Sequence, residues 1–424
     1  MRLGVEGSKS QGFALFPEAA RLARAAAHRH TCRMADQPDR GTPADGAIRA
    51  VVQGNRLELI ESGAGRLEEL LKIIARAEES LRLIFYIFDS DDSGRRVRDA
   101  LVEAARRGVL VRLLVDGFGC STAEPEFFGA IRDAGGDFCV FNPRYGARYL
   151  IRNHQKLVVA DKTVGLIGGA NVQDSYLSDE GEGHWRDLWL RIEGPALEEP
   201  SRYFDELFRW TKTKNSKLRN LRRIVKRHSQ MVGHLQWKFS GPISRKHSWP
   251  ASLVRELSEA RNADLIAAYF SPPRSLMRRF ARIARKGQVR IITAAKSDNN
   301  ATIGAARHTY SRLLRRGVRM FEYQPAKLHT KLGIVDDIVH VGSSNLDFRS
   351  LYINLEIMLR IEDAGFAADM RRYFEHEMRD SEEITLALHR QRATLWRRFK
   401  WTVSHWLVTA LDYTVTKRLN FKET

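Results

Sequence analysis

Polar and apolar residues alternate along the chain with two different periods. Residues 65–81 and 93–108 carry apolar side chains at the spacing of an amphipathic helix, with charged residues between them. Residues 82–88 and 109–119 contain compact apolar runs, which are typical of buried strands. Because strand and helix follow each other in turn, the pattern predicts an α/β domain with a mixed β-sheet flanked by helices.

The same order of elements occurs a second time. Residues 263–294 repeat the pattern of residues 80–117, which indicates one domain present in two copies. The chain of 424 residues is also long enough for two domains of ordinary size. We therefore predict five segments: a poorly ordered lead-in or linker (1–54), a first domain (55–200), a basic connecting segment (201–249), a second domain (250–380) and a basic, Trp-rich amphipathic tail (381–424).

One polar motif, His-x-Lys-x(4)-Asp, occurs once in each copy, and the two histidines are 175 residues apart. The residues between Lys and Asp are apolar, so each motif is predicted to lie on a strand. Because side chains two residues apart project to the same side of a strand, each His and Lys should share a face. The candidate residues of the two motifs are His154, Lys156 and Asp161, and His329, Lys331 and Asp336.

Each motif is followed by an apolar strand and a turn of small residues that ends in Asn171 or Asn345. Small residues let backbone and amide groups approach a bulky oxyanion, and Ser343 in the second turn adds a hydroxyl. Asp187 and Glu356 each open a later strand. We expect each of these two carboxylates to hold the imidazole of its own half and to fix its tautomer.

Together these side chains predict phosphodiester chemistry that needs no metal and no cofactor. One histidine can act as nucleophile and the other as proton donor for the leaving alcohol. The lysines and asparagines, with Ser343, would bind the phosphoryl oxygens. Since each half supplies half of the site, the two domains must pack face to face around one shared site.

The motifs and the internal repeat resemble the phospholipase D superfamily over about Asn55 to Asp363. The second half is similar to bacterial cardiolipin synthases of the short, peripheral type. The residues that carry this similarity are Gly342, Ser343, Asn345, Asp347, Arg349, Ser350, Asn354 and Glu356. The resemblance implies a phosphohistidine intermediate with His154 as nucleophile and His329 as general acid, although the reverse assignment stays open. It also implies that Asp161 and Asp336 rank below the His and Lys residues, with structural roles.

The resemblance favours a phosphatidyltransferase that joins two phospholipids into cardiolipin. A phospholipase D that uses water is the first alternative, since the two reactions differ only in what enters second. A phosphodiesterase acting on nucleic acid is the second, and a membrane-binding scaffold is the third. The expected substrates are phosphatidylglycerol and, as a further candidate, phosphatidylethanolamine, with no obligate nucleic acid and with the oligomeric state open.

The charge of the chain agrees with an anionic partner. Its 70 Lys and Arg exceed its 51 Asp and Glu, which gives a net charge of +19. Residues 211–227 hold eight Lys or Arg, and Trp396, Trp401 and Trp406 lie among basic residues near the C-terminus. This tail fits a membrane interface or a helix packed on the catalytic body. We expect a peripheral protein at the cytoplasmic face of the membrane, because no apolar run is long enough to span a bilayer and no signal peptide is evident.

The remaining polar side chains have simpler explanations. Three cysteines without metal-ligand spacing are expected to be free thiols in a reducing compartment. Asp91 and Asp92 precede a helix and are interpreted as N-terminal capping residues. His184 and His340 are expected to be structural, and Tyr86 and Tyr269 to be packing residues at strand ends. The cysteines are Cys32, Cys120 and Cys139.

Overall fold

The computed structural model describes residues 47–120, 125–141, 151–179, 183–242 and 249–420, with side chains of the last helix described as far as Val408. All of these residues belong to one compact unit that begins at Ala47. The predicted lead-in before that residue, including Cys32, lies outside the described residues.

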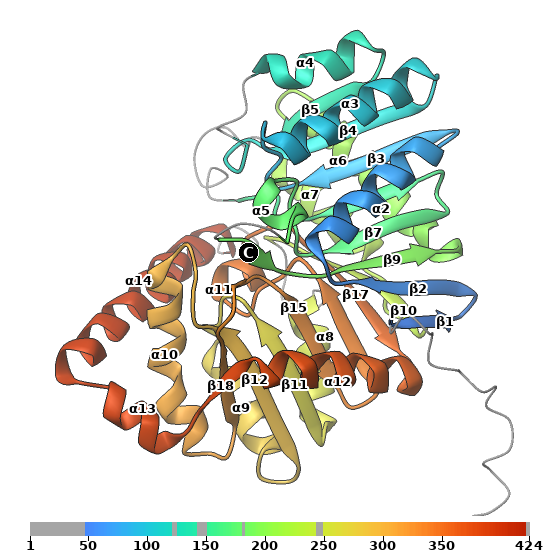
Figure 1. Ribbon diagram of the computed structural model, residues 1–424. Coiled ribbons are helices and arrows are strands. Elements are labelled where there is room, and N and C mark those ends of the chain that lie inside the picture. Colours follow the sequence, from blue (N-terminus) through green and yellow to red (C-terminus); the bar gives the residue numbers. More distant parts are fainter. Residues whose placement is uncertain (1–46, 121–124, 142–150, 180–182, 243–248, 421–424) are drawn as a thin grey trace, which may run out of the picture. The chain divides into compact units, whose positions relative to one another are not determined.

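The first half of the chain builds an eight-stranded mixed sheet in the order β1-β2-β9-β7-β6-β3-β4-β5 (Figure 1). Strands β3, β4 and β5 are parallel, and the other neighbours are antiparallel. The strands are β1 (Arg49–Val52), β2 (Asn55–Ile60), β3 (Ser80–Phe85), β4 (Leu110–Asp116), β5 (Asp137–Phe141), β6 (Leu157–Ala160), β7 (Val164–Gly168) and β9 (Trp189–Glu193).

The second half builds another eight-stranded sheet with the same plan, in the order β10-β17-β16-β15-β11-β12-β13-β18. Its parallel strands β11, β12 and β13 correspond to β3, β4 and β5, and β15 lies antiparallel to β11 as β6 does to β3. The predicted duplication of a mixed α/β domain is therefore confirmed. The strands are β10 (Leu235–Ser240), β11 (Asn262–Ala267), β12 (Gln288–Ala294), β13 (Arg319–Tyr323), β15 (Lys331–Val335), β16 (Ile338–Gly342), β17 (Glu356–Glu362) and β18 (Ser381–Ile384).

Helices flank both sheets, as the amphipathic periods predict. Asp91 caps α3 by accepting a hydrogen bond from the backbone N–H of Gly94 at 3.0 Å, which confirms its capping role. The helices of the first half are α2 (Gly63–Arg76), α3 (Asp92–Arg106), α4 (Pro125–Asp133), α5 (Asp174–Leu177), α6 (Glu198–Lys212) and α7 (Leu218–His228). Those of the second half are α8 (Trp249–Glu259), α9 (Arg274–Ile283), α10 (Asn300–Leu314), α11 (Phe348–Tyr352), α12 (Ala364–Arg379), α13 (Leu386–Arg392) and α14 (Leu395–Asn420).

Three strands lie outside the domain limits that composition predicts. Strand β1 begins at Arg49, inside the predicted lead-in. Strand β10 falls in the predicted connecting segment but pairs with β17, and β18 falls in the predicted tail but pairs with β13. Strands β10 and β18 are each defined by a partner that is distant in sequence, and β1 pairs with the adjacent β2 in a segment whose composition resembles a linker. Local composition therefore does not reveal these three strands.

The hydrophobic core joins the two halves. One cluster of buried residues contains Ile84 and Leu190 of the first sheet, Ile334 and Leu359 of the second, and side chains of α6 and α12. Each half also has one further cluster of buried residues, which lies under its own helices. The site is thus built on a continuous apolar interior, which fixes the sheets against each other. Among the described helices, none combines the length and the apolar character needed to cross a bilayer.

Candidate active site

The two His-x-Lys motifs lie at equivalent places in the two sheets. His154 and Lys156 immediately precede β6, while His329 precedes β15 and Lys331 begins it. Both strands lie beside the first parallel strand of their sheet. The two lysine side chains and His329 are buried, and the side chain of His154 is 12% exposed.

Backbone pairing between the halves brings each motif to the other domain. Strand β14 (Lys327–Leu328) pairs in parallel with β8 (Trp185–Arg186) of the first half. In the same way, Asn153 forms a parallel bridge with Leu355 of the second half. The next residue along each pairing is a histidine on one side and a carboxylate on the other, so the register itself places the imidazoles against the acids.

Each histidine therefore contacts the carboxylate of the opposite half. Nδ1 of His329 lies 2.6 Å from Oδ2 of Asp187, and Nδ1 of His154 lies 3.1 Å from Oε2 of Glu356. The prediction that each carboxylate holds the histidine of its own half is wrong. Within each sheet, one strand lies between the strand near the acid and the strand near the histidine: β7 between β9 and β6, and β16 between β17 and β15. The backbone pairing between the halves instead makes each histidine a direct neighbour of the acid from the other half.

The hydrogen bonds fix the state of both rings. A carboxylate oxygen accepts, so Nδ1 carries the proton and Nε2 keeps a lone pair for the substrate. Burial, with the charges of Lys156 and Lys331, lowers the pKa of His154 well below its usual value. Burial and the same two lysines lower the pKa of His329 to about 3, against the opposing effect of Asp187. Since both lysines act on both rings, the motifs form one site.

The lysines are braced by their own motifs. Nζ of Lys156 donates to the backbone carbonyl of His154 at 2.7 Å, and Nζ of Lys331 donates to that of His329. Burial lowers the pKa of Lys156 to about 7 and that of Lys331 to about 8. The site therefore concentrates two cations that gain from the arrival of a phosphodiester anion.

The two asparagines keep amide donors available. Oδ1 of Asn171 accepts from the backbone N–H of Ile87 at 3.1 Å, and Oδ1 of Asn345 accepts from that of Tyr269 at 3.3 Å. Both side chains are buried. With the oxygen fixed by the backbone, the amide N–H groups are the donors of each side chain, and the side chain of Asn171 also hydrogen-bonds to Tyr176.

Ser343 contacts a carboxylate, which contradicts its predicted contact with phosphate. Its hydroxyl donates to Oε2 of Glu356 at 2.5 Å and accepts from the N–H of Ile357 at 3.1 Å. The single hydroxyl proton is thus committed to the acid behind His154. In the first half Gly169 takes this position, and a Cβ there would lie 2.5 Å from Oδ2 of Asp187. The glycine leaves room for the shorter acid.

Asp161 and Asp336 do not join the cluster, which agrees with the structural role that the resemblance implies for them. They lie at the far ends of β6 and β15 and accept from backbone N–H groups. Asp161 binds those of Glu78, Glu79 and Ser80 at 2.7–2.9 Å. Asp336 binds those of Arg261 and Asn262 at 3.1 and 2.9 Å. A strand of several residues separates them from the lysines, and their role is to tie strand ends together.

The two acids differ in their surroundings. Burial raises the pKa of Asp187, but Lys331 and His329 outweigh it and the pKa is lowered overall. Its Oδ1 accepts from the N–H of Leu188 at 2.8 Å. Burial raises the pKa of Glu356 to about 8 despite the opposing charge of Lys156. Its Oε1 is buried and has no hydrogen-bond partner within the described parts of the chain.

Aromatic rings enclose both imidazoles. The ring of Tyr86 lies 5.0 Å from that of His154, so this tyrosine, expected to serve packing, also lines the site. Tyr176 and Trp185 present themselves edge-on to His329 at 5.0 and 5.2 Å. Sequence analysis missed these two. In the repeat, Ser350 stands where the first half has Tyr176, so comparing the copies gives no signal for it.

The other expectations are resolved by local contacts. His340 is buried between Glu256, 2.6 Å from its Nε2, and Trp249, whose indole N–H donates to Nδ1, which confirms a structural role. Cys120 and Cys139 are buried free thiols, as expected. His184 lines a surface pocket with residues of α2, α3 and α5. Within the described residues, no cluster of His, Cys, Asp or Glu is arranged to hold a metal ion.

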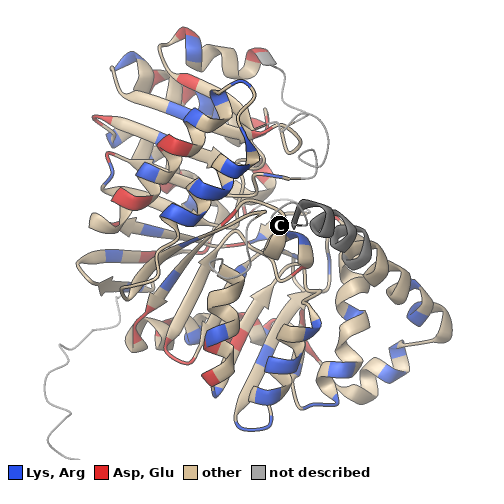
Figure 2. Ribbon diagram, turned by 180° about the vertical axis from the view of Figure 1, so that it is seen from behind, with Lys and Arg blue, Asp and Glu red and all other residues tan. Residues whose placement is uncertain are grey.

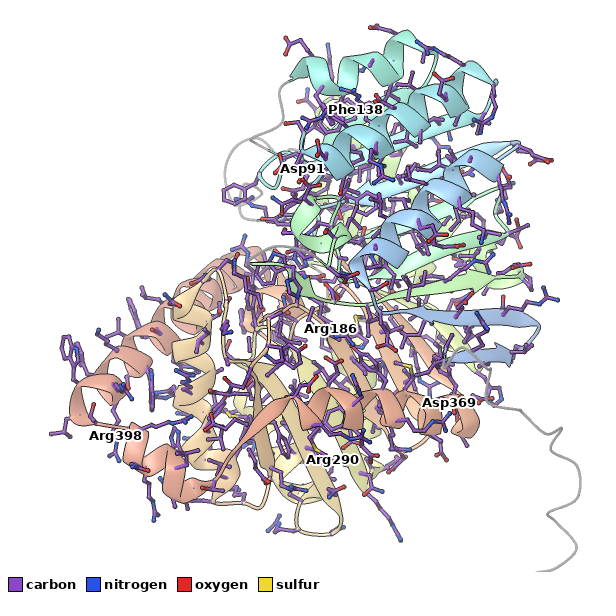
Figure 3. All side chains as sticks on the ribbon, viewed as in Figure 1. Asp91, Phe138, Arg186, Arg290, Asp369 and Arg398 are labelled. Carbon is purple, nitrogen blue, oxygen red and sulfur yellow. The ribbon has the colours of Figure 1, made fainter. Side chains whose placement is uncertain are left out.

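Arg186 ties the two halves together next to the site. Its guanidinium contacts Glu377 of α12 at 2.5 Å and Glu61 at 2.9 Å, and Figure 3 shows it where the two sheets meet. Because Asp187 follows it directly, this ion pair also steadies the backbone that presents Asp187 to His329.

Comparison with known proteins agrees with this geometry. The family described as "Cardiolipin synthase, PLD-like domain" matches residues 70–207 and 253–378. The chain is 32% identical to cardiolipin synthase 1 of Bacillus cereus over 345 residues, which covers 77% of this chain and 67% of that protein. It is 31% identical to the major cardiolipin synthase of Bacillus subtilis over 368 residues, which covers 84% and 75%.

Solved structures share the fold. The crystal structure of phosphatidylserine synthase from Haemophilus influenzae superposes with a TM-score of 0.66 at 13% identity, covering 85% of this chain and 94% of that one. Both motifs, their pairing across the halves and the match over both domains lead to one assignment. The chain belongs to the cardiolipin synthase family of phospholipase D-like enzymes.

Proposed function

We propose that this protein is a cardiolipin synthase that transfers a phosphatidyl group from one phosphatidylglycerol to the terminal hydroxyl of another. The observation that carries the proposal is the pair of His–carboxylate contacts across the halves, with two buried lysines between them. Two imidazoles with Nε2 lone pairs, both under the charges of the same two lysines, suit a reaction at a single phosphorus atom. The cardiolipin synthases among its relatives support the choice of substrate.

The reaction proceeds in two displacements. When the phosphodiester anion binds, the second histidine takes up a proton on Nε2 and becomes an imidazolium. Nε2 of the nucleophilic histidine then attacks phosphorus, the bond to the glycerol headgroup breaks, and the second histidine gives its Nε2 proton to the departing glycerol oxygen. The hydroxyl of a second phosphatidylglycerol then gives its proton to that histidine and attacks the phosphohistidine. The P–N bond breaks, and cardiolipin forms while both rings return to their starting states. Lys156, Lys331 and the amides of Asn171 and Asn345 hold the phosphoryl oxygens throughout.

The difference between the two acids supports His154 as the nucleophile. An ionised carboxylate stabilises an imidazolium, and Asp187, whose pKa is lowered, gives this support to His329. The pKa of Glu356 is raised to about 8, so its contact favours a neutral His154 with a free lone pair. A bound phosphodiester anion raises the pKa of both rings. The imidazolium of His329 is the more stable of the two, because the ionised Asp187 contacts it.

The first experiment is a lipid assay in EDTA. Purified protein, His154→Ala and His329→Ala are each mixed with phosphatidylglycerol vesicles, with and without phosphatidylethanolamine. Cardiolipin formed only by the unmodified protein supports the proposal, and the lipid requirement identifies the donor. Phosphatidic acid as the only product would mean that water enters instead and that the protein is a phospholipase D. Turnover of DNA but of no lipid would overturn the proposal in favour of a nuclease.

A second experiment separates nucleophile from acid. A phosphatidyl ester of p-nitrophenol has a leaving group that departs without protonation. We expect His329→Ala to release p-nitrophenolate in a burst and to accumulate a phosphatidyl adduct on His154, which intact-protein mass spectrometry detects. His154→Ala should give neither. The reverse result would assign the nucleophile to His329.

A further inference from the structure

Helix α14 displays an apolar stripe to solvent. Trp396, Phe399 and Trp406 are 62%, 59% and 58% exposed. Single exposed apolar residues are ordinary at protein surfaces, but a contiguous row is not. We call this row the α14 stripe, and it consists of Leu395, Trp396, Phe399, Val403, Trp406 and Leu407.

The stripe occupies one side of the helix. At 3.6 residues per turn, its six members fall within about a third of the circumference. The opposite side is already used: Trp401 stacks on His389 at 5.4 Å, and His405 stacks on His308 of α10 at 4.4 Å. Packing on the body of the protein therefore accounts for one face of α14 and leaves the stripe unexplained.

Close packing against α10 holds the helix rigidly. A Cβ on Gly304 would lie 2.8 Å from Oγ of Ser404, so the missing side chain allows the two helices to approach. Figure 1 shows α14 running beside α10, and it also contacts α11. Since α11 follows the Asn345 turn of the active site, the stripe is carried on a helix that is anchored next to the catalytic machinery.

The charge carried by this segment is basic, although Arg392 is neutralised by Glu382 at 2.6 Å. Residues 386–408 contain Arg390, Arg392, Arg397, Arg398 and Lys400 and no acid, and Figure 2 shows only basic coloring on this described part of the chain. Nζ of Lys400 lies 5.2 Å from the ring centre of Trp396, and Arg398 is labelled on the same helix in Figure 3. Tryptophan beside cations is the combination that binds the interface of an anionic bilayer, where the ring enters the headgroup layer and the cations meet phosphate.

We propose that the α14 stripe is a membrane-docking surface that inserts into the headgroup layer of an anionic phospholipid bilayer and holds the active site at the lipid surface. Only the statement that the stripe holds the active site at the lipid surface rests on the proposed function. Binding of the stripe to a membrane is independent of turnover. An interfacial enzyme gains from such a surface, since its lipid substrates do not leave the bilayer readily.

The test uses the full chain with the substitutions Trp396→Glu and Phe399→Glu, singly and together. Val232→Glu is the matched control, because Val232 is an apolar residue that is 87% exposed on the loop before β10. Binding is measured by co-sedimentation with vesicles of phosphatidylglycerol and phosphatidylcholine. We expect the double variant to bind at least about tenfold more weakly, while Val232→Glu binds like the unmodified protein. Binding should also weaken as salt rises.

Turnover is measured in parallel on vesicles and on a short-chain phosphatidylglycerol below its micelle concentration. The double variant should lose activity on vesicles and keep it on the soluble lipid. If no variant or control turns over either substrate, the proposed function fails, while the binding data still decide the docking surface. Unchanged vesicle binding by the double variant would overturn the docking proposal. If sedimentation velocity then showed that the substitutions dissociate a dimer, the stripe would be an interface between copies.

Discussion

Nδ1 of His329 lies 2.6 Å from Oδ2 of Asp187, which is 142 residues earlier in the chain and in the other half of the duplication. His154 and Glu356 repeat the relationship in the opposite direction at 3.1 Å. Neither half holds a complete histidine–carboxylate pair by itself. The site therefore exists only when both domains are folded and packed, which explains why one chain carries the motif twice.

Asp187→Asn is expected to lower kcat by about two to four orders of magnitude, because an amide supports neither the tautomer nor the imidazolium of His329. Glu356→Gln should lower kcat clearly less than Asp187→Asn does, since Glu356 already favours its neutral form. The measurement is cardiolipin formation at saturating lipid, with circular dichroism to verify folding. Equal losses in the two variants would contradict the asymmetry between the dyads.

Gly169→Ala should reduce kcat strongly with a smaller effect on KM. The added Cβ would lie 2.5 Å from Oδ2 of Asp187 and must push this carboxylate away from His329. Gly129→Ala in α4 is the control, because nothing lies within 4 Å of a Cβ there. A Gly169→Ala enzyme with normal kcat would show that Asp187 can move without harm to catalysis.

Asp336→Asn should lower stability more than activity. The carboxylate accepts from the backbone N–H groups of Arg261 and Asn262, and the amide can replace only part of this. We expect the free energy of unfolding to fall by about 1–3 kcal/mol, measured by urea denaturation. At urea concentrations where the variant is still folded, its kcat should stay within about threefold of that of the unmodified protein. A loss comparable with that of His329→Ala would contradict the structural role and place Asp336 among the catalytic residues.

The pH profile should show an alkaline limb set by the lysines. Burial lowers the pKa of Lys156 from 10.5 to about 7 and that of Lys331 to about 8. The charged forms that bind phosphate are therefore lost as pH rises through this range, and kcat/KM should fall above about pH 7. In Lys331→Arg the guanidinium keeps its charge, so the part of the limb due to Lys331 should move upward. An unchanged limb in this variant would assign it to another group.

The same shifts predict how pH acts on stability. A lysine whose pKa is lowered in the folded state binds fewer protons there than in the unfolded chain between the two pKa values. Stability from these two residues should therefore rise with pH from about 7 toward 10.5. Lys156→Met removes this contribution and should flatten the curve, which thermal unfolding at several pH values can measure. A steeper curve in the variant would contradict the assigned direction.

The sequence alone determined the repeated α/β fold and the identity of the reactive pairs. Strand and helix periods are local properties, so they predict β3, α3 and β4 and their counterparts directly. The His-x-Lys spacing likewise placed His154 with Lys156 and His329 with Lys331, although only Lys331 lies on a strand and the other three residues lie just before β6 and β15.

Tertiary structure decided which groups meet. The pairing of β14 with β8, and of Asn153 with Leu355, assigns each acid to the histidine of the other half. It also brings Tyr176 and Trp185 to His329. These contacts join segments that are far apart in sequence and depend on the register between two domains. No local pattern encodes that register, because it results from the burial of one hydrophobic core shared by both sheets.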